Sequence, residues 1–209
     1  MGSTPRGLTV FTLGGLRPGA VDALSAHFAP LEVLSLELAA EASLTASQPL
    51  LRAEVNRAAN DWVFLLRDGE TVTRAAAAEM SASVTDPPNA WGFRLRVQPA
   101  CGGEPLLLES SLSGEIRFFH RRHARFDLRG KGGAMNVEGT VLRLGEPLAR
   151  ELFPSHEAHR AWLAGRGVPH SALRRVLLFA KRAVAARGRN RATLRWLWDE
   201  AGWDLEESR

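Results

Sequence analysis

The pattern of apolar positions in the first 85 residues switches repeatedly between the period of a strand and the period of a helix. Short apolar and β-branched runs predict strands at Leu8–Leu13, Leu31–Leu36 and Asp61–Leu66. Apolar residues recur at helical spacing in Pro18–Phe28, Pro49–Ala59 and Thr73–Ser83. The third run is almost wholly apolar, as expected of a central parallel strand buried on both faces. This alternation predicts an α/β fold with a doubly wound, mostly parallel sheet.

The middle of the chain has a different pattern, in which short strands are separated by glycine-rich turns. Strand patterns occupy Trp91–Val97, Glu115–His120, Ala124–Leu128 and Asn136–Leu144, and we expect antiparallel hairpins there. From Pro154 onward the pattern is helical, with breaks at Gly165–Pro169 and Gly188–Asn190. We therefore predict a first domain over residues 1–150 and a helical C-terminal extension over residues 151–209 that packs on it.

The ends of two predicted strands carry the candidate ligand-binding residues. The first strand leads into Gly14-Gly15, and the third leads into Arg67-Asp68-Gly69-Glu70. In doubly wound sheets, ligands bind beyond the carboxyl ends of the parallel strands. The alternative interpretation is that Arg67–Glu70 is a solvated surface turn.

Several segments resemble those of family 2 glycosyltransferases. Asn60–Thr73 is similar to a motif in which an Asp-Trp pair opens a buried strand that ends in Leu-Asp-x-Asp-Glu. Arg117–Phe126 and Gly139–Leu144 are similar to the Arg-x-Phe-Arg-Arg strand and the Gly-x-Val-x-x-Leu run of the branch that contains lipopolysaccharide-core glucosyltransferases. The resemblance covers roughly Leu8 to Leu148. It implies a GT-A-like nucleotide-diphospho-sugar transferase fold, in which a sugar passes from a UDP-type donor to a cell-envelope glycan or a lipid-linked acceptor.

The same resemblance implies a divalent metal ion, Mg²⁺ or Mn²⁺. Such an ion stabilises the negative charge that develops on a departing nucleotide diphosphate, and it prefers oxygen ligands. An alignment without a gap places Arg67 and Gly69 at the family's two acidic positions, whereas a shift of one residue places Asp68 and Glu70 there. In the shifted alignment, Asp68 and Glu70 hold the metal and the donor diphosphate, and Arg67 contacts a phosphate. Both alignments stay open at this point.

Other features of the family are missing from this chain. Leu13–Leu16, which includes Gly14 and Gly15, stands where the family has a polar segment that wraps the nucleotide base. The family's Arg-Asn pair before the central strand falls at Leu51-Arg52, and its later His-Glu pair is replaced within Gly130–Asn136. These coordinated departures favour an alternative hypothesis, a catalytically inactive glycosyltransferase homologue that acts as a binding or scaffold subunit. The two hypotheses differ in whether the chain is an enzyme.

Charge adds one local feature. The net charge of the 209 residues is only +4, but Ser171–Arg195 holds eight basic residues and no acidic one, with Trp196 and Trp198 directly after it. A basic amphipathic helix with nearby tryptophans predicts peripheral contact with an anionic membrane surface. The alternative is a helix packed on the domain with its basic face in solvent. Nucleic-acid binding is a weaker third interpretation, because no nucleic-acid-binding motif accompanies the charge.

Composition favours the cytoplasm, with the inner membrane face as the surface that a peripheral protein would meet. The chain has no apolar stretch of the roughly 18 residues that a membrane span requires, no secretory-type segment at its start, and a single cysteine, Cys101.

Two histidine pairs and one glycine-rich loop complete the set of candidates. His120 and His123, and likewise His156 and His159, are three positions apart. The spacing of the second pair can hold zinc, but no third ligand is evident from the sequence, so we interpret both pairs as surface residues. Lys131 among Gly130, Gly132 and Gly133 predicts either a phosphate-binding loop or a hairpin turn.

Overall fold

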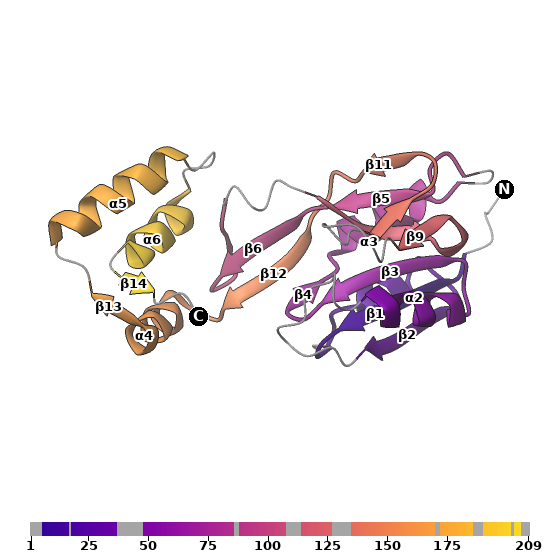
Figure 1. The fold of residues 1–209 in the computed structure, drawn as a ribbon, viewed down its shortest axis with the longest axis horizontal. Coiled ribbons are helices and arrows are strands. Elements are labelled where there is room, and N and C mark those ends of the chain that lie inside the picture. Colours follow the sequence, from indigo (N-terminus) through magenta and orange to yellow (C-terminus); the bar gives the residue numbers. More distant parts are fainter. Residues whose placement is uncertain are drawn as a thin grey trace. The chain divides into compact units, whose positions relative to one another are not determined.

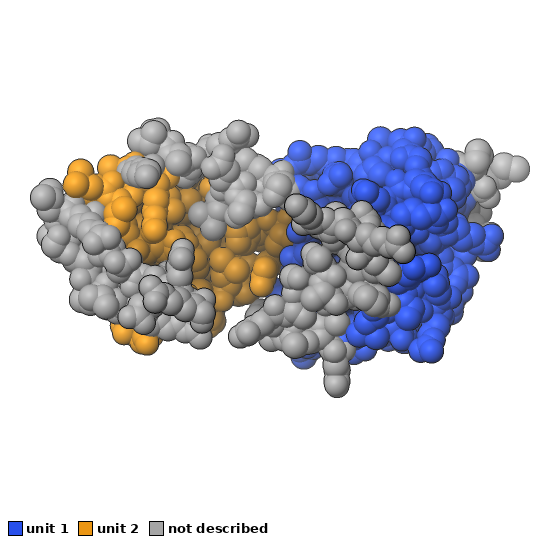
Figure 2. Space-filling view, viewed as in Figure 1, with its two compact units in different colours: residues 1–96, 114–148 blue, residues 97–113, 149–209 orange. Residues whose placement is uncertain are grey.

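The chain folds into two structural units. The computed structural model describes residues 6–16, 18–36, 48–85, 88–107, 114–126, 135–169, 172–185, 190–201 and 203–205. Unit 1 consists of residues 1–96 and 114–148, and unit 2 consists of residues 97–113 and 149–209 (Figure 2). The segment 97–113, which the sequence pattern places in the first domain, therefore belongs to the unit that contains the C-terminal helices.

A mixed six-stranded sheet forms the centre of unit 1 (Figure 1). Its order is β11-β5-β8-β3-β1-β2. The strands are β1 (Leu8–Leu13), β2 (Leu31–Leu36), β3 (Trp62–Arg67), β5 (Gly92–Leu95), β8 (Glu115–His120) and β11 (Val141–Arg143). Strand β1 pairs in parallel with β2 and β3, whereas β8 runs antiparallel to both β3 and β5. The α/β fold and its parallel strands around β1 are confirmed.

The apolar runs explain why β1 and β3 lie inside the sheet. All six residues of β1 and the five residues Trp62–Leu66 of β3 are buried. One cluster of the unit 1 core is made by buried residues of β1, β2, β3, β8, helix α2 and the start of β9, and includes Phe11, Val55, Val63 and Phe119. A continuous apolar sequence is what burial on both faces of a sheet requires.

Three helices accompany the first strands: α1 (Asp22–Ser25), α2 (Gln48–Arg57) and α3 (Arg74–Ser83). Helix α3 begins where predicted, because the Thr73 hydroxyl accepts a hydrogen bond from the backbone N–H of Ala76 at 3.1 Å. Helix α1 is much shorter than the predicted Pro18–Phe28. Gly19 has a φ of +77°, which is incompatible with a right-handed helix and places a turn before Asp22.

The predicted strands in the middle of the chain are interrupted. The pattern predicts one strand over Trp91–Val97, but β5 ends at Leu95 and β6 (Val97–Cys101) begins in the other unit. Asn136–Leu144 contains two short strands, β10 (Met135–Val137) and β11, separated by Gly139 with a φ of +101°. Strand β10 pairs in antiparallel fashion with β9 (Ala124–Phe126), which follows the 3₁₀ turn η2 (Arg121–His123). Strand β4 (Glu70–Thr71) is a short segment after β3.

Unit 2 combines short strands with three helices (Figure 1). Strands β12 (Leu148–Phe153), β6 and β7 (Glu104–Pro105) lie side by side in that order. The helices are α4 (His156–Arg166), α5 (Ala172–Ala185) and α6 (Arg191–Glu200), and β13 (Gly167–Pro169) pairs with β14 (Trp203–Leu205). One core cluster joins Cys101 and Leu106 to three residues of α6: Ala192, Trp196 and Leu197.

Helix α6 starts at a defined cap, since the Asn190 side chain accepts a hydrogen bond from the N–H of Thr193 at 2.8 Å.

Among the described residues, none of the helices is both long enough and apolar enough to cross a membrane.

Candidate functional site

The structure brings together the two loops at the carboxyl edge of the unit 1 sheet. Leu13 and Arg67 are opposite each other at the ends of the parallel strands β1 and β3. The N–H of Asp68 donates a hydrogen bond to the carbonyl of Leu13 at 3.1 Å. Gly14 has a φ of +98°, and a Cβ atom built on it would lie 3.1 Å from the Cβ of Asp68. The candidate residues Gly14 and Gly15 therefore lie beside Asp68, and their role in ligand binding stays a prediction.

Glu70 is held in a buried ion pair. Its carboxylate Oε2 accepts hydrogen bonds from Nη1 of Arg117 at 2.7 Å and from the backbone N–H of Arg67 at 2.9 Å. The side chains of Arg117 and Glu70 are only 4% and 1% exposed. Among the described residues, the other oxygen of Glu70, Oε1, has no hydrogen-bond partner.

Two further charged groups extend this pair. Glu115 Oε2 lies 2.8 Å from Nη2 of Arg67 and 3.1 Å from Nη2 of Arg117. Arg67, Glu70, Glu115 and Arg117 thus form a network of two cations and two anions, which compensate one another. Asp68 stands outside these contacts and is exposed. The sequence pattern placed Arg117 on a strand but did not reveal that it is the partner of Glu70.

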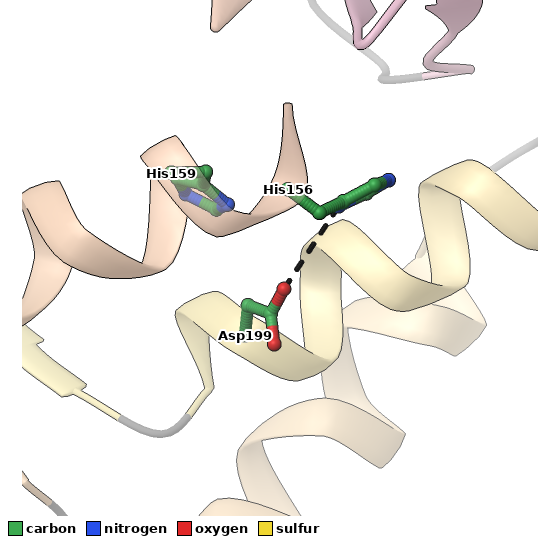
Figure 3. A group of neighbouring side chains, drawn as sticks. All are labelled: His156, His159 and Asp199. Carbon is green, nitrogen blue, oxygen red and sulfur yellow. Dashed lines mark ion pairs between the residues drawn. The ribbon is translucent and has the colours of Figure 1, made fainter. Parts of the chain in front are cut away.

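A second group of side chains lies in unit 2, where His156 and His159 on α4 approach Asp199 in the last turn of α6 (Figure 3). Nδ1 of His156 is 3.9 Å from Oδ2 of Asp199, and one nitrogen or oxygen atom from each of the three residues lies within 4.8 Å of the other two. His159 is fully buried, Asp199 is 3% exposed, and the His156 side chain is 10% exposed.

The interpretation of His156 and His159 as surface residues is therefore wrong. The third residue of the group comes from a helix 40 positions further along the chain, so local spacing could not reveal it. One signal was available in the sequence. Ala192, Trp196 and Asp199 follow the i, i+4, i+7 spacing of a buried helical stripe, which places an aspartate at an interior position.

Aromatic packing fixes the orientation of His159. Its ring stacks on Trp196 with a centroid separation of 3.6 Å and an interplanar angle of 5°. Phe153 packs against both rings, at 5.1 Å from His159 and 5.8 Å from Trp196. The other carboxylate oxygen of Asp199, Oδ1, lies 4.0 Å from Nη2 of Arg175. The guanidinium of Arg175 lies over the Trp198 ring, 4.4 Å from the ring centroid.

Burial governs the protonation of this group. It lowers the pKa of His159 to about 4, with the neighbouring His156 as a smaller cause, and it lowers the pKa of His156 as well. Burial also raises the pKa of Asp199, against the influence of Arg160 and His156. Near neutral pH both imidazoles are therefore uncharged, and each has one nitrogen lone pair available to accept a hydrogen bond or bind a metal ion.

The other histidine pair is arranged differently. His123, which is half-buried, stacks on Trp91 at 3.8 Å. The His120 side chain is only 13% exposed and packs edge-on against Trp62 and Trp91, so its assignment to the surface is wrong. Nε2 of His120 is 4.0 Å from Asp61, but Asp61 is already paired with Arg121 at 3.1 Å and Arg122 at 3.4 Å.

Helix α5 contacts α6 through several of its described side chains. Phe179 packs edge-on against Trp198, and Nη1 of Arg182 lies 3.5 Å from Oε2 of Glu200. Leu177 is 62% exposed.

Contact of Ser171–Arg195 with a membrane surface stays a prediction. The loop around Lys131 lies outside the described residues.

No protein-family model matches this chain, and no curated protein matches it with significance.

Proposed function

We propose that unit 1 is a glycosyltransferase-like domain that does not carry out metal-dependent sugar transfer and acts as a binding or scaffold module. The observation that carries this proposal is the buried ion pair between Glu70 and Arg117. The GT-A-like part of the proposal is supported by the parallel strands β2, β1 and β3, and by the meeting of Gly14-Gly15 with Arg67–Glu70 at their carboxyl edge.

The residues at this edge do not fit the two-carboxylate metal site that the family resemblance implies. Oε2 of Glu70 is already bound by the Arg117 guanidinium and by the N–H of Arg67. A divalent cation at the remaining buried oxygen, Oε1, would lie close to the Arg117 guanidinium, and the two positive charges would repel each other. Arg67 and Gly69, the positions in the alignment without a gap, offer no carboxylate at all. Of the predicted pair, Asp68 and Glu70, only Asp68 has a carboxylate that solvent can reach. One carboxylate is a weak set of ligands for Mg²⁺ or Mn²⁺.

An active transferase is the second candidate, and the position of Asp68 favours it. The Asp68 carboxylate is exposed beside Gly14 and Gly15, with Oδ1 3.7 Å from where a Gly15 side chain would begin. A glycine pair allows a ligand to approach the backbone closely. In this candidate, Asp68 contributes to holding a UDP-sugar donor whose sugar passes to a cell-envelope acceptor.

Calorimetric titration of the full chain with UDP, first with Mn²⁺ and then with EDTA, distinguishes the candidates. We expect any affinity for UDP to be the same under both conditions, and we expect no release of UDP from UDP-sugars. Asp68→Asn tests the exposed carboxylate, and Glu54→Gln on α2 is the control for the loss of one acidic group. Mn²⁺-dependent UDP binding that Asp68→Asn abolishes and Glu54→Gln retains would overturn the proposal in favour of the active transferase.

A further inference from the structure

His156, His159 and Asp199 lie together in unit 2, with one nitrogen or oxygen atom of each within 4.8 Å of the other two. We propose that they bind one divalent first-row transition-metal ion, for which Zn²⁺ is the reference ion. This inference concerns α4 and α6 and does not depend on the function proposed for unit 1.

The chemistry of the three side chains matches this class of ion. Two imidazole nitrogens and one carboxylate oxygen make a ligand set that zinc accepts at metal–ligand distances of about 2.0–2.2 Å. Neighbouring ligand atoms of a tetrahedral ion at such distances are roughly 3.3 Å apart. The 3.9 Å between His156 Nδ1 and Asp199 Oδ2, and the 4.8 Å limit for the whole group, are within reach of that spacing by rotation of the His156 and Asp199 side chains, while His159 keeps its stacked orientation. Mg²⁺ and Ca²⁺ prefer an all-oxygen set, which this group does not offer.

Unpartnered polar atoms supply an independent observation. Among the described residues, both ring nitrogens of His156, both ring nitrogens of His159 and Oδ2 of Asp199 are buried without a hydrogen-bond partner. Buried polar groups in native proteins are almost always partnered, because a buried polar group without a partner loses its hydrogen bonds to water and gains none in return. One metal ion would provide a partner for an atom of each of the three residues at once.

The histidine pair of unit 1 shows what distinguishes the unit 2 group. His120 and His123 have the same spacing and both pack against Trp91, His120 edge-on and His123 stacked. Nε2 of His120 lies 4.0 Å from an acid, Asp61. Asp61 is 41% exposed and is held by two arginines. At Asp199, by contrast, Nη2 of Arg175 is 4.0 Å from Oδ1, and Oδ2, which is 3.9 Å from Nδ1 of His156, has no hydrogen-bond partner among the described residues.

The position of the ligands gives the ion a structural role. His156 and His159 belong to the first turns of α4, and Asp199 belongs to the last turn of α6. An ion bound to all three would connect the two helices and stabilise the folded form of unit 2. Three protein ligands leave the fourth position of a tetrahedral zinc ion to a water molecule.

The test uses the full chain with any affinity tag removed, stripped of metal with a chelator and then dialysed. Titration with Zn²⁺ is expected to show one ion per chain, and added Zn²⁺ is expected to raise the thermal midpoint of unfolding. Co²⁺ provides a spectroscopic readout, because a four-coordinate site with nitrogen ligands gives visible absorption. Asp199→Asn and His156→Gln preserve side-chain size, and each is expected to weaken Zn²⁺ binding more than about tenfold, since loss of even an outer-shell partner can cost that much.

His123→Gln is the matched control, because it removes a histidine that stacks on tryptophan but lies outside the group. It is expected to bind Zn²⁺ like the unchanged chain. Circular dichroism without metal identifies the variants that remain folded, and only these are compared. The proposal is overturned if the unchanged chain binds no Zn²⁺ at micromolar concentration, or if folded Asp199→Asn and His123→Gln bind it equally well.

Discussion

Arg117 lies 2.7 Å from Glu70, 47 positions earlier in the chain, and both side chains are almost completely buried. Glu70 directly follows the turn after β3, and Arg117 belongs to β8, the antiparallel neighbour of β3. The pair therefore fixes a loop at the carboxyl edge of the sheet to the strand beside it. Its energetic weight can be measured directly.

Replacing Glu70 should strongly destabilise the protein. Glu70→Gln leaves the buried Arg117 guanidinium with the half-exposed Glu115 as its anion in place of the buried Glu70. Breaking a buried pair costs about 3–5 kcal/mol. Urea unfolding measures the loss. The comparison is Glu54→Gln, which removes a pair with Arg57, an arginine whose side chain is 75% exposed, and should change stability by about 0–1 kcal/mol. Equal effects of the two variants would contradict the buried pair as described.

A side chain at Gly14 should disturb the contact between the two edge loops. Gly14→Ala places a Cβ at a φ of +98° and 3.1 Å from the Cβ of Asp68. Left-handed backbone alone costs a non-glycine residue about 1–2 kcal/mol. Gly103→Ala isolates that backbone cost, because Gly103 has a φ of +75° and a Cβ added there would meet no atom within 4 Å. We expect Gly14→Ala to lower the free energy of unfolding more than Gly103→Ala does. The additional destabilisation by Gly14→Ala, beyond that caused by Gly103→Ala, should be smaller when Asp68 is replaced as well, in the double variant Gly14→Ala/Asp68→Gly. If it is not smaller, Asp68 is not its cause.

His120 should make stability depend on pH. Burial lowers the pKa of His120, while the nearby Asp61 opposes the shift. Below the ordinary histidine pKa of about 6.5, this histidine binds a proton in the unfolded chain but stays neutral in the folded chain. The contribution of neutral His120 to stability is therefore complete above a pH of about 6.5, and it is lost as the pH falls through the lowered pKa of the folded chain. Urea unfolding at pH 7.5 and pH 5.5 should show a smaller difference for His120→Gln than for the unchanged chain. An identical difference in the two proteins would show that His120 does not titrate in this way.

Much of unit 1 could be predicted because its signals are local. Trp62–Leu66 is apolar throughout, and Leu8–Leu13 is apolar apart from the buried Thr9 and Thr12. The structure places these runs in β3 and β1, as burial on both sheet faces predicts. The proximity of Gly14-Gly15 to Asp68 follows from the same fact, since parallel neighbours end at one edge.

The ionic contacts of unit 1 and the group of His156, His159 and Asp199 in unit 2 could not be predicted in the same way. Glu70 and Arg117 come from segments whose pairing depends on the order of β3 and β8 in the sheet. His159 and Asp199 meet only because α4 and α6 pack together. The length of α1 was predicted wrongly because the apolar spacing does not show the backbone conformation of Gly19. The positive φ of Gly19 prevents the helix from beginning at Pro18.

The boundaries of the two units have a consequence for how this protein can be divided. The chain passes from one unit to the other after residues 96, 113 and 148, so neither unit is a continuous stretch of sequence. Removing residues 151–209 would leave Cys101 and Leu106 without Ala192, Trp196 and Leu197, their apolar partners in the core cluster. Unit 2 is therefore not a detachable tail. A recombination event that transferred it to another protein would have to carry an internal insertion together with the C-terminal segment, and a shortened gene would encode an incompletely packed chain.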